Sequence, residues 1–417
     1  MSFVAEQGPF GGLGALAVSS PPGWNMLDLL TFLSGLTCAF WVVLLLDRKR
    51  WWPRDHQLGA DSACAEPSPG DEVVVVIPAR DEAETLPLTL PSLLEQGDSY
   101  SALVVVDDSS TDGTGDVARR LAAACPWVEK VGVVRGSPAP PGWSGKLHAL
   151  AMGLSAEAIR RGGQPSGSRW LLFTDADVRH SRRSVRRLLA KAREGAYDLV
   201  SVMVRLNCGS FWERVLIPPF VYFFQLLYPF RRVSDPRSRV AAAAGGCILV
   251  RESTFRQMGG FGEICGAVID DVALASRVKG AGGRCWLGTD PEMVSVRAYG
   301  SFAEIARMVS RTAFTQLNHS WVLLTATLLV LGVFFVAPPV LVALHFALGK
   351  GIPGLMALAA CVIQAATLAP VVRHQRVSPL FAFTLPLASL LYAWMTFRSA
   401  WLYFGARGVE WKGRRVG

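Results

Sequence analysis

The stretch Leu-Val-Val-Val-Asp-Asp-Ser-Ser-Thr-Asp-Gly-Thr, residues 103–114, joins a strand of buried type to two carboxylates and a turn. The pattern returns at Trp-Leu-Leu-Phe-Thr-Asp-Ala-Asp, residues 170–177, and a third acidic pair, Asp270-Asp271, follows the glycine-rich stretch 259–266. Concentrated carboxylates cost free energy unless they face a metal, a cation or a reacting group. The pattern therefore predicts metal-assisted chemistry on a phosphorylated donor.

Strands and helices alternate around these clusters, which favours a parallel, doubly wound α/β sheet. Ligands of such sheets bind beyond the carboxyl ends of the strands, where the acidic clusters lie. The expected strands are Glu72–Ile77, Leu103–Val106, Val131–Arg135 and Trp170–Phe173, and the expected helices are Ala83–Gln96, Thr114–Ala124, Leu147–Ile159, Arg182–Arg193 and Asp271–Lys279.

Long apolar runs flank this region in a chain of 417 residues that is 51% hydrophobic and 18% charged. Each run is long enough to cross a bilayer as a helix. Pro338-Pro339 and Pro386 are expected to kink two of them, which neighbouring helices can tolerate. The runs are Met26–Leu46, Val322–Leu348, Ile352–Val372 and Pro379–Phe404.

These runs divide the chain into six expected parts. They are an N-terminal tail (1–25), a transmembrane helix (26–47), a linker (48–71), an α/β domain (72–320), transmembrane or re-entrant helices (321–405) and a basic tail (406–417). Within the α/β domain, residues 211–230 are rich in aromatic residues and contain Pro218-Pro219, which favours an interfacial membrane segment. A pair of buried core helices is the alternative.

Basic residues follow the first apolar run at Arg48, Lys49 and Arg50. The positive-inside rule places this flank, and hence the α/β domain, in the cytoplasm of a multi-pass protein of the inner (cell) membrane. Three further complete spans would leave the basic tail outside, so one run is expected to be re-entrant or interfacial.

The formal net charge is +9, and much of the excess is arginine beside the apolar segments. Positive-inside flanking explains this charge, with contact to anionic lipid or pyrophosphate as the alternative. No aromatic-plus-basic motif accompanies it, so nucleic acid is not an expected partner. The eight cysteines show no CxxC pair or Cys/His spacing, which argues against a zinc site and a disulfide framework.

Each candidate site residue has an ordinary structural alternative. Asp108 can bind a nucleotide, or its loop can simply cap a helix. Asp175 and Asp177 can reach a ribose and ligate Mg²⁺ or Mn²⁺, or can belong to a solvated loop. Asp271 can act as a general base, and Asp270-Asp271 can instead cap a helix dipole. Lys146 can bind phosphate or lie on the surface, and Gly245-Gly246 can admit a substrate or form a turn.

The order of these features resembles the family 2 glycosyltransferases, which have the GT-A fold, a Rossmann-like α/β domain. The resemblance covers about residues 72–320 and rests on five motifs. Pro141–Lys146, together with the C-terminal bundle, is most similar to the hopene-associated glycosyltransferases called HpnB, and Trp411–Arg414 resembles a tail of lipid glycosyltransferases. The five motifs are Val76–Glu82, Asp107–Thr114, Asp175–Asp177, Gly245-Gly246 and Asp270–Leu274.

The resemblance implies a role for each matching residue. Asp271 is the expected catalytic base and Asp177 the expected ligand of Mg²⁺ or Mn²⁺ on the donor diphosphate. Lys146 or Arg311 is expected to help neutralise the leaving diphosphate. The remaining donor-site residues are Ala79, Glu82, Asp108 and Asp175, and the acceptor-site residues are Gly245, Gly246 and Asp270.

The function that the resemblance implies is inverting transfer of one sugar from a nucleotide-diphosphate sugar, with UDP favoured, to a lipid, in hopanoid or related lipid biosynthesis. One alternative is a processive polysaccharide synthase. Its Gln-x-x-Arg-Trp motif is replaced here by Arg307, Arg311 and Gln316–His319. A second alternative is a non-catalytic scaffold that binds nucleotide sugar in the membrane. A dinucleotide oxidoreductase is disfavoured because no Gly-x-Gly-x-x-Gly follows the first strand.

Overall fold

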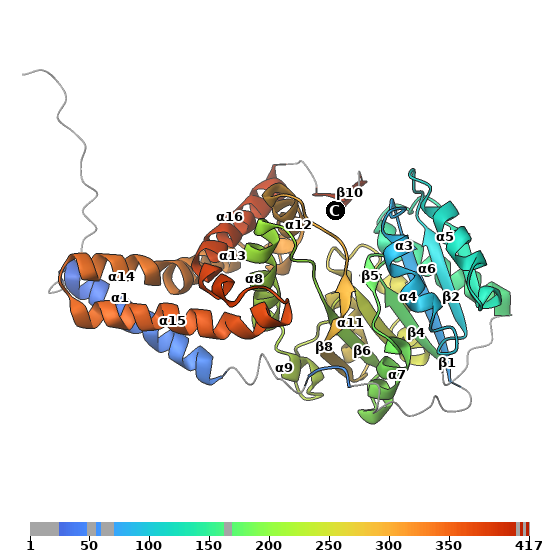
Figure 1. The fold of residues 1–417 in the computed structure, drawn as a ribbon, viewed down its shortest axis with the longest axis horizontal. Helices are drawn as coiled ribbons and strands as arrows, with labels where there is room; N and C mark the ends of the chain where they lie inside the picture. Colours follow the sequence, from blue (N-terminus) through green and yellow to red (C-terminus); the bar gives the residue numbers. More distant parts are fainter. Residues whose placement is uncertain are drawn as a thin grey trace, which may run out of the picture.

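The computed structural model describes residues 25–47, 56–59, 71–161, 169–405, 409–411 and 414–416. Most of the N-terminal tail and of the linker therefore lies outside the described residues, as do side chains of the basic tail. Within the described residues, a sheet domain and a helical bundle form two lobes, with α8 (Phe211–Leu227) and α12 (Phe302–Gln316) between them (Figure 1).

The sheet domain is built on one eight-stranded mixed sheet with the order β3-β2-β1-β4-β7-β6-β8-β5. The strands β3, β2, β1 and β4 are parallel, and β6 is parallel to β8, whereas β7 runs antiparallel to both of its neighbours. The strands are β1 Glu72–Ala79, β2 Ala102–Asp107, β3 Val131–Arg135, β4 Arg169–Thr174, β5 Val178–Arg179, β6 Leu199–Arg205, β7 Cys247–Arg251 and β8 Cys285–Ser295.

Helices cover both faces of this sheet, and short ones link its strands. They are α3 Leu86–Thr89, α4 Pro91–Leu94, α5 Thr114–Ala123, η2 Val128–Lys130, α6 Gly145–Arg161, α7 Ser184–Glu194, α9 Phe230–Ser234, α10 Glu252–Gln257, η3 Gly260–Ile264 and α11 Asp270–Gly280.

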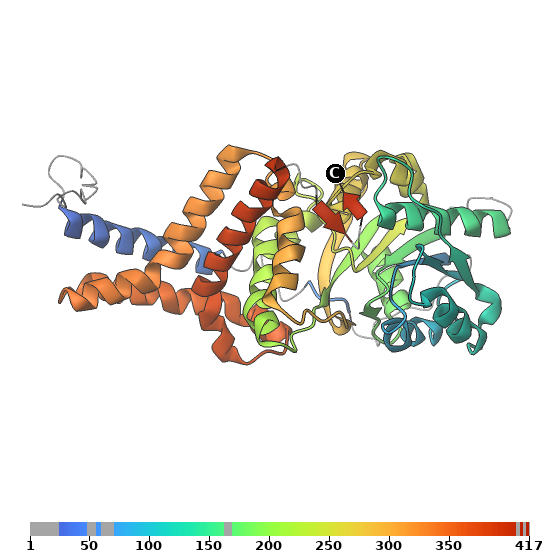
Figure 2. The ribbon, with the colours of Figure 1, turned by 90° about the horizontal axis from the view of Figure 1, so that it is seen from above.

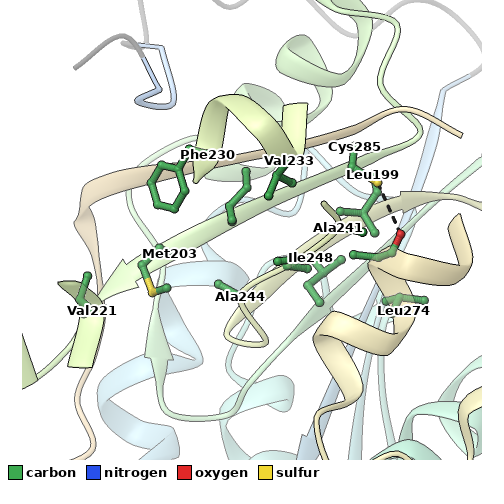
Figure 3. Close-up of a cluster of buried hydrophobic side chains, with 14 of the residues drawn as sticks. Leu199, Met203, Val221, Phe230, Val233, Ala241, Ala244, Ile248, Leu274 and Cys285 are labelled. Carbon is green, nitrogen blue, oxygen red and sulfur yellow. Dashed lines mark hydrogen bonds between the residues drawn. The ribbon is translucent and has the colours of Figure 1, made fainter. Parts of the chain in front are cut away.

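The first strand shows why the sheet forms. Val74 and Val76 point into one core beside α6, and Val73, Val75 and Ile77 point into the other. Successive side chains of a strand face opposite sides, so a continuous apolar run suits a sheet that is covered on both faces. The first of these cores continues across β6 and β7 to α8, α9 and α11, where Met203, Val221 and Phe230 are buried (Figure 3).

Two sequence expectations were wrong. The sheet is not wholly parallel, because the chain enters β7 from the site end, directly after Gly245-Gly246, and β7 therefore runs back beside β4. The single helix expected at Ala83–Gln96 is two short helices, α3 and α4. Pro91 causes the break because proline lacks the N–H needed to continue a helix.

Among the residues that the structure describes, four continuous helical segments are long and apolar enough to cross a membrane, judged by length and composition. The helices α1, α14 and α15 lie side by side, directed away from the sheet (Figure 2). A π-helical turn, η4 (Leu331–Val336), precedes Pro338-Pro339, and Trp41 Nε1 donates to the Phe334 carbonyl there at 2.7 Å. The bundle elements are α1 Met26–Leu46, α13 Trp321–Val330, α14 Ala337–Ala347, α15 Gly351–His374, η5 Pro379–Thr384 and α16 Leu385–Phe404.

The domain boundaries and the interfacial position of residues 211–230 stay predictions. α8 is a single helix that continues through Pro218 and Pro219. One side of it is buried against α12, α15 and α16, and Phe211 and Leu227 are exposed. A small hairpin, β9 (Val409–Trp411) with β10 (Arg414–Val416), follows the bundle.

Candidate active site

A cleft of about 370 Å³ lies at the carboxyl ends of the parallel strands, between the sheet domain and the helices α8 and α12. All eleven residues that the sequence nominated line this one cleft, although they come from seven different segments of the chain. They are Ala79, Glu82, Asp108, Lys146, Asp175, Asp177, Gly245, Gly246, Asp270, Asp271 and Arg311.

The sequence allowed two interpretations of the loop after β2, a structural turn and a ligand-binding site, and the loop has features of both. Asp107 accepts from the Ser110 N–H at 3.0 Å, and Asp112 accepts from the Ala83 N–H at 2.9 Å, so these two carboxylates hold the turn. Asp108 is buried and lines the cleft, with Oδ2 at 3.7 Å from Arg80 Nη1. Of the three aspartates, Asp108 is the one that lines the cleft.

Lys146 lies at the first turn of α6 and joins two acidic clusters. Its Nζ is 2.8 Å from Asp175 Oδ1 and 3.4 Å from Asp270 Oδ2. Burial lowers the pKa of Lys146, but the charges of the surrounding carboxylates outweigh burial, and its pKa is raised. Gly153 allows α6 to approach the sheet closely, since a Cβ there would lie 2.5 Å from Val76 Cγ1. The amine is therefore a fixed positive charge in the cleft.

Asp271 lies in the first turn of α11, and backbone groups hold both of its carboxylate oxygens. Oδ2 accepts from the Gly245 N–H at 2.9 Å, and Oδ1 accepts from the Val272 N–H at 2.8 Å. Burial and the charge of Asp270 raise the pKa of Asp271 to about 7, although Lys146 opposes the shift. A carboxylate with such a pKa is suited to general-base work near neutral pH.

The glycine pair is placed by polar contacts beneath the cleft. The Gly246 carbonyl accepts from Thr174 Oγ1 at 2.8 Å, and His180 Nε2 contacts the same hydroxyl at 2.8 Å. Burial lowers the pKa of His180 to about 3, so this imidazole stays neutral and is a structural support. A Cβ on Gly245 would lie 3.3 Å from both Asp271 Oδ2 and Lys146 Nζ, so this position has little room for a side chain.

Arg297 is a cleft residue that the sequence reasoning missed. Its Nη2 donates to Glu82 Oε1 at 2.7 Å, and its Nε is 3.5 Å from Asp177 Oδ2. Burial lowers the pKa of Arg297, but Asp177 and Glu82 outweigh burial and raise it. Ser295 was missed as well, and its Oγ donates to Asp177 Oδ2 at 2.7 Å. Neither was found because the strand β8, which ends at Ser295 and is followed by Arg297, was not predicted.

The carboxylate oxygens of Asp177 fit a divalent metal whose other ligands are mainly water and the phosphate oxygens of a bound substrate. No group of three His, Cys, Asp or Glu side chains that could hold a metal ion occurs among the described residues. Mg²⁺ and Mn²⁺ need few protein ligands, because one or two carboxylates combine with water and phosphate oxygens. Asp177 Oδ1 faces no hydrogen-bond donor in the described part of the chain, and Asp177 lines the cleft.

Part of the cleft lining is apolar. The helices α8 and α12, the strand β6 and loop residues that follow β6 and precede α11 supply large hydrophobic side chains to it, and the partly buried Arg311 also lines the cleft. Polar and apolar lining in one cleft suits a ligand pair of unlike polarity. The apolar side chains are Met203, Leu206, Phe220, Phe224, Val268 and Met308.

Comparison with known proteins agrees with this architecture. A mannosyltransferase from Pyrobaculum calidifontis, PcManGT, solved with GDP-Man and Mn²⁺, superposes with a TM-score of 0.54 at 19% identity and covers 90% of this chain and 99% of that one. Such a likeness shows the fold, and the α/β expectation of a GT-A domain with apolar helices at both ends is confirmed.

The sequence comparisons identify the domain. Residues 74–259 match the family described as Glycosyl transferase family 2, so the chain carries a domain of that family. A 4,4'-diaponeurosporenoate glycosyltransferase of Staphylococcus aureus (strain USA300) is 25% identical over 256 residues, which is 60% of this chain and 59% of that relative. The match thus spans less than two thirds of the relative's length. It does not single out the hopene-associated group.

Proposed function

We propose that this chain is a membrane-bound inverting glycosyltransferase that moves one sugar from a nucleotide-diphosphate sugar to a lipid. The observation that carries the proposal is the pairing within one cleft of Asp271, a backbone-held carboxylate whose pKa is about 7, with Asp177 and Lys146. A base and a phosphate-binding region are the two parts that sugar transfer from a diphosphate donor needs.

In this proposal the donor nucleotide lies along the ends of β1 and β2, beside Ala79, Glu82 and Asp108. Asp177 would hold the metal, which would neutralise charge on the diphosphate when bound. Lys146 and Arg311 add fixed positive charge, which favours departure of the diphosphate because it needs no reorganisation during the reaction. Asp271 accepts the proton of the acceptor hydroxyl, which attacks the anomeric carbon from the face opposite the nucleotide.

The apolar wall and the bundle support a lipid acceptor. Large apolar side chains are widely exposed on the bundle, including Val322 (78%), Ile352 (76%) and Trp401 (70%). Exposed patches of this kind indicate contact with a membrane or a partner, since each such side chain gains roughly 1.5–3 kcal/mol on leaving water. A lipid that enters beside α8 reaches Phe220 and Phe224 without crossing water.

The finer parts of the proposal rest on sequence. Arg48, Lys49 and Arg50 support a cytoplasmic active site at the inner (cell) membrane by the positive-inside rule. Pro141–Lys146 supports an acceptor of hopanoid or related type. UDP is the favoured donor nucleotide, although PcManGT was solved with GDP-Man, so GDP donors belong in the test.

The proposal predicts that Asp177→Ala lowers transfer on the order of 10²-fold, because the metal loses its protein ligand. The assay uses the full chain in detergent with radiolabelled UDP- and GDP-sugars, Mn²⁺ or Mg²⁺, and a total lipid extract. Its matched control is Asp116→Ala, an exposed position on α5 outside the cleft.

A labelled lipid that disappears in Asp177→Ala and persists in Asp116→Ala supports the proposal. A long sugar polymer in place of the lipid product identifies a processive synthase. Donor binding without turnover for every acceptor tested identifies a scaffold.

The raised pKa of Asp271 predicts an acidic limit to activity near pH 7. A general base must be ionised to accept a proton. The Asp271 carboxyl keeps its own proton up to about pH 7, whereas an ordinary aspartate is ionised above about pH 4. We expect kcat/KM to fall about tenfold per pH unit below 7 and to level off above it. Donor affinity, measured separately across the same range, controls for loss of binding. A profile flat down to pH 5 would contradict the assignment.

A further inference from the structure

Arg297 contacts two carboxylates of the proposed donor site, those of Glu82 and Asp177. Its guanidinium donates to Glu82 Oε1 at 2.7 Å and lies 3.5 Å from Asp177 Oδ2. The side chains of Glu82 and Asp177 are only 8% and 14% exposed, whereas that of Arg297 is 37% exposed. The cation therefore lies at the open side of two recessed carboxylates.

This position conflicts with a metal bound at Asp177. A divalent cation at Asp177 would approach the guanidinium within a few ångströms, and repulsion between like charges is stronger in a partly buried cleft than in water. Asp177 Oδ2 is also engaged by Ser295 Oγ at 2.7 Å, so this oxygen is already held from two sides. Asp177 therefore attracts the metal strongly only when another anion neutralises the charge of Arg297 or draws its guanidinium away.

The donor diphosphate is such an anion. A guanidinium matches phosphate oxygens as well as it matches carboxylates, and it keeps its charge in either place. We infer, on the basis of the proposed function, that Arg297 couples metal binding to donor binding. It holds Glu82 and Asp177 while the donor is absent, and it turns to the diphosphate when the metal takes Asp177.

Coupling of this kind is reciprocal, so nucleotide and metal must strengthen each other by the same factor. In the wild-type chain we expect UDP or GDP to raise Mn²⁺ affinity about tenfold or more, within the usual range for coupled sites. In Arg297→Gln, Glu82 and Asp177 lose the positive charge of this guanidinium. Mn²⁺ alone should then bind about tenfold more tightly than in the wild type, and the enhancement by nucleotide should be smaller by a similar factor.

The test is a titration of Mn²⁺ followed by the electron paramagnetic resonance signal of the free ion, which needs no turnover. It uses the full chain in detergent, alone and with UDP or GDP, as wild type, Arg297→Gln and Arg297→Lys. Arg297→Lys keeps the charge and should behave as the wild type. The matched control is Arg277→Gln, an exposed arginine on α11 whose partner Glu263 is also exposed and outside the cleft.

Tighter Mn²⁺ binding in Arg297→Gln alone, with a smaller nucleotide effect, supports the coupling. Nucleotide enhancement of equal size in the wild type and in Arg297→Gln overturns it while leaving the metal-dependent function intact. Wild-type Mn²⁺ affinity that does not respond to nucleotide also overturns it, whether or not the variants fold. Absence of Mn²⁺ binding under every condition overturns both the coupling and the metal part of the proposed function.

Discussion

Replacement of Asp271 with asparagine is expected to lower sugar transfer on the order of 10³-fold, which is the usual contribution of a positioned general base. The asparagine amide cannot take up the proton of the hydroxyl group on the acceptor lipid. It also meets two N–H donors, from Gly245 and Val272, with a single acceptor oxygen. Donor affinity should change by less than about threefold, because Asp271 lies at the acceptor end in the proposed arrangement. Single-turnover transfer and nucleotide binding, measured on the same preparation, separate the two effects.

Asp270→Asn is the sharpest comparison for this prediction. Asp270 is the neighbouring residue and lies 3.4 Å from Lys146 Nζ, but backbone N–H groups hold Asp271 and not Asp270 among the described hydrogen bonds. We expect Asp270→Asn to lose about tenfold in activity, in keeping with a charge that acts through Lys146. If Asp271→Asn retained turnover and Asp270→Asn lost it, Asp270 would be the general base and Asp271 would not.

Thermal stability separates loss of the base from loss of the fold. The pKa of Asp271 is raised in the folded chain, so the folded state binds this proton more tightly than the unfolded state between about pH 4 and pH 7. Stability from this group is therefore present at low pH and is lost as the pH rises through 7. Asp271→Asn removes this titration, so its Tm should change less between pH 5 and pH 8 than that of the wild type.

The parallel half of the sheet could be predicted because each of its strands can be recognised from its own local sequence. Val73–Val76 and Leu103–Val106 are unbroken β-branched or aliphatic runs that end at Pro78 or at Asp107, and burial on both faces produces such runs. The other half was not predicted, although β6 is itself a largely aliphatic run of seven residues. β8 contains Gly288 and Pro291, which interrupt the apolar pattern, and β7 has only five residues.

The carboxylates of the site and Lys146 were predictable, whereas the arginine partners Arg80 and Arg297 were not. Asp108, Asp175 and Asp177 each follow an apolar strand, so topology alone places them at one edge of the sheet. Arg80 and Arg297 are 2 of 42 basic residues, and their local sequence does not show that they face a cleft. Their role arises from contacts such as Arg297 with Glu82, 215 residues apart, which only the folded chain creates.

Replacement of Lys146 with glutamine is expected to lower transfer on the order of 10²- to 10³-fold at pH 7, and to move the acidic limb of the pH profile upward. Two causes combine. The donor diphosphate loses a fixed cation, an effect of the size measured for single electrostatic groups in active sites. In addition, the charge of Lys146 lowers the pKa of Asp271, so its removal lets burial and Asp270 raise that pKa further above 7.

The shift of the pH limb distinguishes this coupling from a simple loss of donor affinity. We expect the limb in Lys146→Gln to rise by about one unit, within the range that a nearby charge produces, so that part of the lost activity returns at pH 9. Lys146→Arg keeps the positive charge and should keep the limb near 7. Lys350→Gln, at the exposed start of α15, is the control for loss of one positive charge. An unmoved limb in Lys146→Gln would show that the amine serves the donor alone, and that the titration of Asp271 is governed by burial and by Asp270.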